Sequence, residues 1–189
     1  MENLSRKISD ILVKKDIIEC QNRNFYGYCI EVILLYFINL ATIFIWAIFV
    51  GKFLECCFLL ILISLLRNYC GGIHMNTWYS CYFITCALIG LILSICDKII
   101  IDWYVLVPIL LISTICIWKL APCQHPNHEL EPDIVLKCKK KAKIFTVLEM
   151  FVAIFLKLNK RETGVTLCCT TFILCTILLV LGKLTERRI

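Results

Sequence analysis

The sequence predicts an all-α integral membrane protein that forms a single membrane domain over residues 1–189. The chain is 60% hydrophobic and only 18% charged, whereas about half of a soluble domain is apolar. Its mean hydropathy is +0.85. Its apolar residues fall in stretches of the length that crosses a bilayer, about twenty residues for a helix. A water-soluble globular protein is therefore excluded, because too few polar residues remain to cover its surface.

Six apolar stretches are predicted to be transmembrane helices. They are Val32–Val50, Cys56–Leu66, Trp78–Cys96, Trp103–Trp118, Ile144–Leu156 and Gly164–Gly182. The second and fifth are short, so each either crosses with help from its neighbours or is re-entrant. The second can borrow Phe53 and Leu54, and Pro108 predicts a kink in the fourth.

Residues 1–24 are predicted to form an amphipathic helix in the membrane interface. From Leu4 to Ile18, apolar residues recur at helical spacing on one face, and charged residues occupy the other. A packed cytoplasmic helix would show the same periodicity. Phe25, Tyr26 and Tyr28 then resemble the aromatic belt at which a chain enters the bilayer. The N-terminus lacks the pattern of a cleaved signal peptide.

Lysine and arginine side chains predict the orientation of the chain. If six helices cross and the N-terminus is cytoplasmic, most of these cations fall on the inner side, as the positive-inside rule requires. The segment 67–81 and the basic loop 119–143 then share the cytoplasmic face.

The fourteen cysteines are predicted to be free. Most lie inside apolar stretches, where a thiol behaves as a small hydrophobic group. A disulfide framework is instead typical of small secreted domains.

Reactive side chains are concentrated in the segment Arg67–Cys81, which reads RNYCGGIHMNTWYSC. Bilayer proteins keep ionisable groups where these are hydrated, paired or functional. A cysteine nucleophile reacts as the thiolate, and a histidine within hydrogen-bond reach can take its proton and later return it to the leaving amine. We interpret His74 and Cys81 as such a pair at the membrane surface. The alternative is an interfacial histidine beside a packing cysteine.

The spacing of this pair requires a loop. On one continuous helix, His74 and Cys81 would lie about 10 Å apart along the axis, too far for a hydrogen bond. Gly71 and Gly72 supply the break that lets His74 fold back. Cys70 is a rival nucleophile, but the glycine pair separates it from His74. A thiol at a helix start also gains from the positive end of the helix dipole, which favours Cys81.

Other candidate groups lie later in the chain. Cys123, His125 and His128 are potential metal ligands, with Cys138 as a possible fourth. We interpret them as ordinary loop residues and predict no metal and no cofactor. Glu149 interrupts the fifth stretch and is either an intramembrane functional group or the partner of a lysine.

The basic groups have two interpretations each. Arg67 either anchors the cytoplasmic face or stabilises a carboxylate or oxyanion. The lysine run binds either anionic lipid headgroups or an acidic segment of a substrate. Its members are Lys137, Lys139, Lys140, Lys141 and Lys143. We expect no nucleic-acid partner.

The motif residues carry a family resemblance. Arg67, Gly71, Gly72, His74 and Cys81 stand in the pattern R-x3-G-G-x-H-x6-C, and the chain resembles the accessory gene regulator protein B (AgrB) family over essentially its whole length. Ala121-Pro122, Pro126-Asn127 and the following basic run add support. His128-Glu129 stands where the family often has Lys-Pro.

The resemblance implies a membrane cysteine endopeptidase of Gram-positive peptide quorum sensing. Such a protein, in the cell membrane with its catalytic site facing the cytoplasm, cuts an AgrD-type precursor peptide, removes its C-terminal tail and closes the remainder into a thiolactone or lactone. By this resemblance His74 is the general base and Cys81 the nucleophile, while Arg67, Gly71 and Gly72 are supporting motif residues. An acidic tail of the precursor would meet the lysine run.

Competing functions remain open from the residues alone. A small peptide transporter would explain six spans and Glu149 without needing a His74–Cys81 pair. A metal-binding or redox protein would use Cys123 and the two histidines that follow it, and a non-enzymatic assembly factor would need none of these groups. Short, imperfect spans also favour a homodimer.

Overall fold

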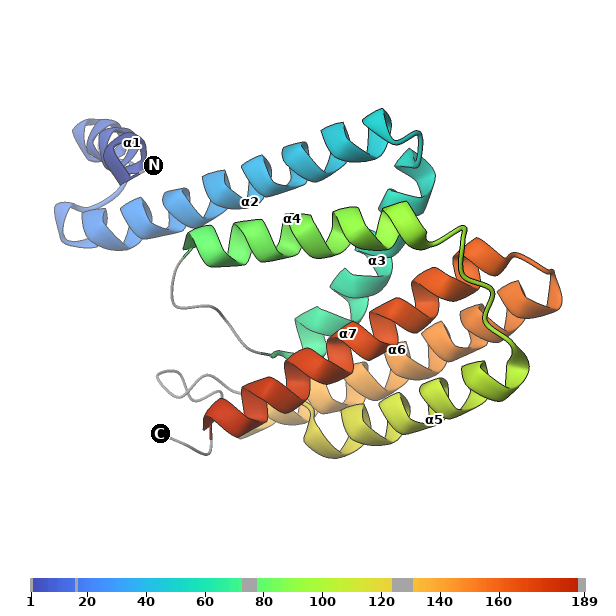
Figure 1. Ribbon diagram of the computed structural model, residues 1–189. Helices are drawn as coiled ribbons and strands as arrows, with labels where there is room; N and C mark the ends of the chain where they lie inside the picture. Colours follow the sequence, from blue (N-terminus) through green and yellow to red (C-terminus); the bar gives the residue numbers. More distant parts are fainter. Residues whose placement is uncertain (1, 16, 73–77, 124–130, 187–189) are drawn as a thin grey trace.

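The computed structural model describes residues 2–15, 17–72, 78–123 and 131–186, which are helical throughout apart from short connections (Figure 1). Its elements are α1 (Glu2–Lys14), the 3₁₀ turn η1 (Cys20–Asn22), α2 (Arg23–Phe49), α3 (Phe53–Cys70), α4 (Trp78–Ile95), α5 (Trp103–Leu120), α6 (Pro132–Leu158) and α7 (Glu162–Glu186). The described ranges contain no strand. The all-α prediction is confirmed.

Four of the described helical segments are long and apolar enough to cross a membrane. They are Cys20–Phe49, Phe53–Cys70, Trp103–Leu120 and Glu162–Thr185, and Tyr79–Ile95 is a shorter apolar helix. Large apolar side chains such as Phe49, Leu54 and Phe83 are exposed on these helices, as they are in a protein surrounded by lipid. The fold is therefore that of a multi-pass membrane protein, and the count of six crossings stays a prediction.

Helix α3 is longer than the short second stretch suggested. It has 18 residues, about 27 Å at the rise of an α-helix, because it includes Phe53 and Leu54 at its start and Arg67–Cys70 at its end. Arg67 is therefore helical, in the last turn of α3.

The structure differs from the expected basic loop 119–143, because residues from Pro132 onward belong to α6. Pro132 stands in the first turn and Asp133 adds an acidic side chain there, and both favour a helix start. Ala142 and Thr146 are buried on the core-facing side of α6. The lysines are thus fixed on a helix whose other face is packed.

The helices pack into two groups that share α3. The larger core joins the C-terminal half of α3 to α5, α6 and α7, and Leu66, Leu106, Ala153 and Phe172 are buried in it. The smaller core joins α2, α4 and the start of α3, with Leu167 of α7 at its margin. Figure 1 shows α2 and α4 side by side, with α3 running from that pair to the α5–α6–α7 group.

Helix α1 packs on the start of α2 through small polar side chains. Ser5 and Ser9 are buried, and a Cβ on Gly27 of α2 would lie 3.5 Å from Ser9 Oγ. An ion pair between Asp10 and Arg23 joins the two helices. Leu4 and Ile11 are instead exposed, so the apolar face of α1 remains available to a membrane surface.

All fourteen cysteines are free. Cys56, Cys96, Cys168, Cys169 and Cys175 are buried in the two cores. The prediction of packing thiols is confirmed for these residues.

Candidate active site

Gly71 and Gly72 end α3 and turn the chain away from the helix axis. Gly71 has φ 72° and ψ −152°, and its N–H donates to the carbonyl oxygen of Arg67 at 3.0 Å. Gly72 has φ 143°. Both φ values lie in the region that glycine adopts without the steric cost of a Cβ. The predicted helix break is therefore present at the predicted residues.

Close backbone contacts surround the two glycines. The N–H of Cys123, in the α5–α6 connection, donates to the carbonyl oxygen of Cys70 at 2.9 Å. A Cβ on Gly71 would lie 2.5 Å from the carbonyl oxygen of Cys123, and a Cβ on Gly72 would lie 3.4 Å from Cβ of Leu178 on α7. The motif thus ties the end of α3 to the α5–α6 connection and to α7. Sequence reasoning did not identify these partners.

Cys81 lies in the first turn of α4, which begins at Trp78. Its side chain is half-buried and its thiol is free. Its carbonyl oxygen accepts a hydrogen bond of 2.7 Å from Oγ1 of Thr85, as a regular helix position allows. Cys70, the rival nucleophile, is only 1% exposed and belongs to the larger core. The structure therefore gives Cys81 the more accessible of the two thiols.

His74 lies outside the described residues, so the predicted His74–Cys81 pair has no described geometry. The chain around it is described on both sides, up to Gly72 and again from Trp78. Figure 1 shows the end of α3 and the start of α4 at the same end of the molecule. The first turn of α4, which contains Cys81, and the glycine-terminated end of α3 therefore belong to the same end of the molecule (Figure 1).

Aromatic side chains hold two of the lysines of α6. Nζ of Lys141 lies 5.1 Å from the ring centre of Tyr69 on α3, and Tyr69 stacks on Phe145 at 5.2 Å. Nζ of Lys143 lies 5.3 Å from the ring centre of Trp118 on α5. All the lysines of the run are exposed, but these contacts direct Lys141 toward the motif helix α3 and Lys143 toward α5.

Of the suggested metal ligands, the structure describes only Cys123 and Cys138. His125 and His128 lie outside the described residues, and the described part of the chain holds no group of three or more His, Cys, Asp or Glu side chains placed to bind a metal. Cys123 instead contributes its backbone to the contact with Cys70.

Two hollows among the described residues are lined by residues other than Cys81. One, of about 500 Å³, separates α1 from α2 and is lined by polar side chains that include Ser9, Arg23 and Glu31. The other, of about 400 Å³, is an open apolar groove between α2 and α3 that ends at Asn68. Neither contains the motif residues, so the site is defined by the contacts above.

These observations define a helical multi-pass membrane protein in which one helix ends at a glycine pair and the next begins with an accessible cysteine. Comparison with known families then identifies the chain more closely. The family model described as Accessory gene regulator B matches residues 5–181, so the chain belongs to the accessory gene regulator B family. No curated protein and no solved structure matches it. Family membership implies a role in processing the autoinducing peptide of this system from an AgrD-type precursor.

Proposed function

We propose that this protein is a membrane-embedded cysteine endopeptidase that cuts the C-terminal tail from its precursor peptide and cyclises the remainder. The observation that carries the proposal is the accessible, free thiol of Cys81 at the start of α4, in a chain of this family. Buried Cys70 is poorly placed to meet a peptide.

The proposed first step forms an acyl-enzyme. His74 takes the proton of the Cys81 thiol, and the thiolate attacks the carbonyl carbon of the scissile peptide bond. The carbon–nitrogen bond then breaks, and the protonated histidine gives the proton to the leaving amine of the tail. The products are a thioester on Cys81 and a free C-terminal peptide.

The second step releases a ring. A thiol or hydroxyl of the bound peptide gives its proton to His74 and attacks the Cys81 thioester, the new thiolactone or lactone bond forms, and Cys81 leaves as the thiolate. Attack by a thiol exchanges one thioester for another and so needs little driving force, whereas water would hydrolyse the intermediate. The site must hold the peptide group close and exclude water. A half-buried thiol at the end of a membrane helix meets both requirements.

Supporting roles fall to Arg67, the glycine pair and the lysines of α6. Gly71 and Gly72 fix where α3 ends, and Arg67 one turn earlier offers a cation for a carboxylate or oxyanion. An acidic tail of the precursor would be attracted to Lys137, Lys139, Lys140, Lys141 and Lys143, all exposed on α6. We place this site on the cytoplasmic side of the cell membrane of a Gram-positive bacterium, since it shares an end of the molecule with the lysine run.

Cleavage in lipid vesicles tests the proposal. The protein would be mixed with an amphipathic, acidic-tailed precursor, and released tail and cyclised peptide measured by mass spectrometry. We expect both products to disappear with Cys81→Ala and with His74→Ala. Cys86→Ala is a matched control, because Cys86 is also half-buried on α4, and it should retain activity. Normal processing by Cys81→Ala would refute the proposal and favour a non-enzymatic role.

A further inference from the structure

A carboxyl group lies in the larger helical core, where the described residues give it no hydrogen-bond partner. The side chain of Glu149 on α6 is only 4% exposed, on the same buried face as Thr146 and Ala153. Neither carboxyl oxygen has a hydrogen-bond partner among the described residues. The alternative in which Glu149 pairs with a lysine is not seen among the described residues, and Lys157 of the same helix donates to Glu162 at 2.8 and 2.9 Å.

The buried groups on the helices around Glu149 are thiols, apolar side chains and single hydroxyls such as those of Ser113 and Thr171. Cys70 of α3 and Cys168 and Cys175 of α7 lie within electrostatic range of it. Arg67 of α3 is a cation that acts on one of these thiols, Cys175. The buried residues of α5 are Leu106, Leu110, Ser113 and Ile117, none of which is ionisable.

This environment favours the protonated, uncharged form of the Glu149 carboxyl group over the carboxylate. A buried carboxylate without a charged or hydrogen-bonding partner carries a large desolvation cost, which the uncharged acid avoids. Thiols and apolar groups are poor ligands for sodium, magnesium or calcium, which prefer several oxygen atoms. The described residues also offer no cluster of three metal-ligating side chains. A proton is the occupant that this site can hold.

We propose that Glu149 is a proton-binding site in the core of the bundle, and that the bound proton lets α6 pack against α3 and α7. The carboxylate takes the proton from the aqueous phase and becomes the neutral acid. Of these two neighbours, α3 ends at the glycine pair and α7 carries Leu178, the close contact of Gly72. Loss of the proton would place a charge between these helices and weaken the packing on which the motif rests. This site is separate from Cys81, and its assignment does not depend on the proposed peptidase.

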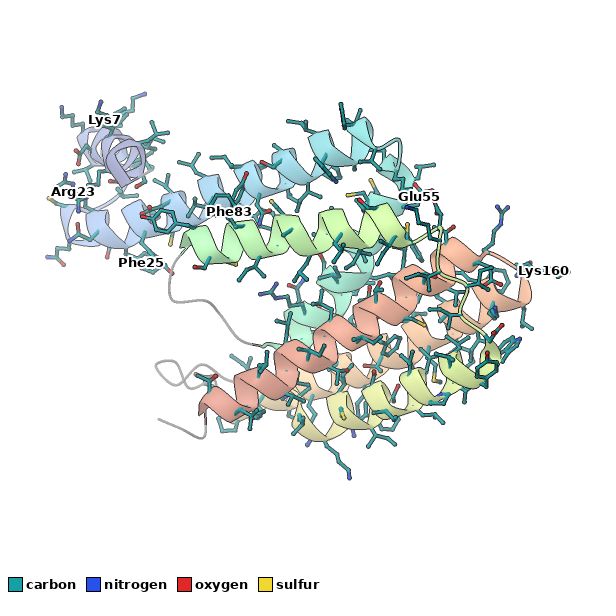
Figure 2. The ribbon with its side chains drawn as sticks, in the orientation of Figure 1. Lys7, Arg23, Phe25, Glu55, Phe83 and Lys160 are labelled. Atoms are coloured by element: carbon teal, nitrogen blue, oxygen red, sulfur yellow. The ribbon has the colours of Figure 1, made fainter. Side chains whose placement is uncertain are left out.

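Infrared spectroscopy of the full chain in lipid films tests the assignment without any reagent having to reach the core. At neutral pH, we expect the C=O stretching band of an isolated protonated carboxyl group, which Glu149→Gln should remove. Glu55→Gln is the matched control, because Glu55 lies in the first turn of α3, at the α2–α3 end of the molecule (Figure 2), and this change should leave the band in place.

Two results would overturn the proposal. If only carboxylate bands occur at neutral pH, Glu149 is charged and has a partner. If sodium chloride abolishes the acid band at constant pH and potassium chloride does not, the occupant is a metal cation. Persistence of the band in both salts supports the proton.

A stability measurement checks the consequence for packing. Raising the pH toward the alkaline range should lower the thermal unfolding midpoint of the wild type more than that of Glu149→Gln, which cannot ionise. Equal pH dependence of the two proteins would contradict a role of this proton in holding α6. Because the comparison follows the slope with pH, it is valid even if the substitution lowers stability overall.

Discussion

The two ends of this molecule are held together by different kinds of contact. At the end with the α2–α3 turn, Nζ of Lys52 pairs with Asp97 at 2.6 Å and donates to the carbonyl oxygen of Leu93 at 2.7 Å. Oγ1 of Thr163 on α7 donates to the same aspartate at 3.0 Å. Polar side chains thus join the α2–α3 turn, the end of α4 and the start of α7.

At the other end, side chains such as Tyr69 and Phe145 also pack together, but the glycine pair itself is held by a backbone contact. The N–H of Cys123 donates to the carbonyl oxygen of Cys70, and the absence of a Cβ on Gly71 leaves room for the backbone of Cys123. The end of α3 and the α5–α6 connection therefore meet through their backbones. A side-chain clamp can adjust when one partner changes, because its members are flexible. A backbone contact that only glycine permits cannot adjust in this way, so we expect the motif end to be the less tolerant of substitution.

The largest effect is expected from Gly71→Ala. The new Cβ would lie 2.5 Å from the carbonyl oxygen of Cys123, so the α5–α6 connection or the end of α3 must move. We expect processing of the precursor to fall by about 100-fold, the order that a displacement of about 1 Å costs a catalytic site. Product formation in vesicles measures this.

Gly51→Ala is the control for that substitution. Gly51 has φ 73°, almost the same as the 72° of Gly71, but no atom lies within 4 Å of the Cβ that it would gain. Both changes place a Cβ at positive φ, where an L side chain carries a steric cost, although Gly71, with ψ −152°, lies in a region that almost only glycine adopts. An equal loss of processing in both variants would show that conformational strain, and not the contact with Cys123, is responsible.

An intermediate effect is expected from the lysines of α6. Lys141 is directed toward Tyr69 on α3, whereas Lys143 lies over Trp118 on α5. If an acidic tail binds on the side of the motif helix, Lys141→Glu should reduce its processing several-fold through like-charge repulsion, and Lys143→Glu should reduce it less. Competition between acidic-tailed and neutral-tailed precursors measures the difference. Equal losses in the two variants would argue for a general effect of charge at the membrane surface.

The smallest effect is expected from Asp97→Asn at the opposite end. The Asp97 side chain is about half exposed, and exposed ion pairs contribute about 1 kcal/mol or less. The hydrogen bond from Lys52 lowers the pKa of Asp97 below its ordinary value. This stabilisation is therefore present above the pKa of the unfolded chain, about 3.9, and is lost as the pH falls through the lower pKa of the folded protein. Thermal unfolding across the acid range should show a shallower loss in Asp97→Asn, with processing near neutral pH unchanged.

The helical class and the positions of most apolar helices could be predicted from the sequence. A long apolar stretch within a bilayer must satisfy its own backbone hydrogen bonds, and a helix does this. The break at Gly71 and Gly72 was also predictable, since two glycines after an apolar stretch end a helix. The start of α6 was missed, although Pro132 and Asp133 carry start signals, because the lysines that follow suggested a solvated loop. The buried face of α6, with Ala142 and Thr146, outweighs those charges.

The partners of the motif could not be predicted. The contacts of Gly71 with Cys123 and of Gly72 with Leu178 join residues far apart in the chain, and no local pattern specifies such pairs. The isolation of Glu149 also depends on which helices surround it. His74, the predicted base, lies outside the described residues, so its role rests on the motif and on experiment.

Intact mass spectrometry of the protein trapped during turnover tests the central claim most directly. The protein in vesicles would be mixed with precursor, stopped in acid and treated with or without hydroxylamine, which cleaves thioesters. We predict a peptide adduct that hydroxylamine removes and that maps to Cys81, unchanged in Cys70→Ala and absent in Cys81→Ala. An adduct that maps to Cys70, or cleavage that continues without any adduct, would contradict the account.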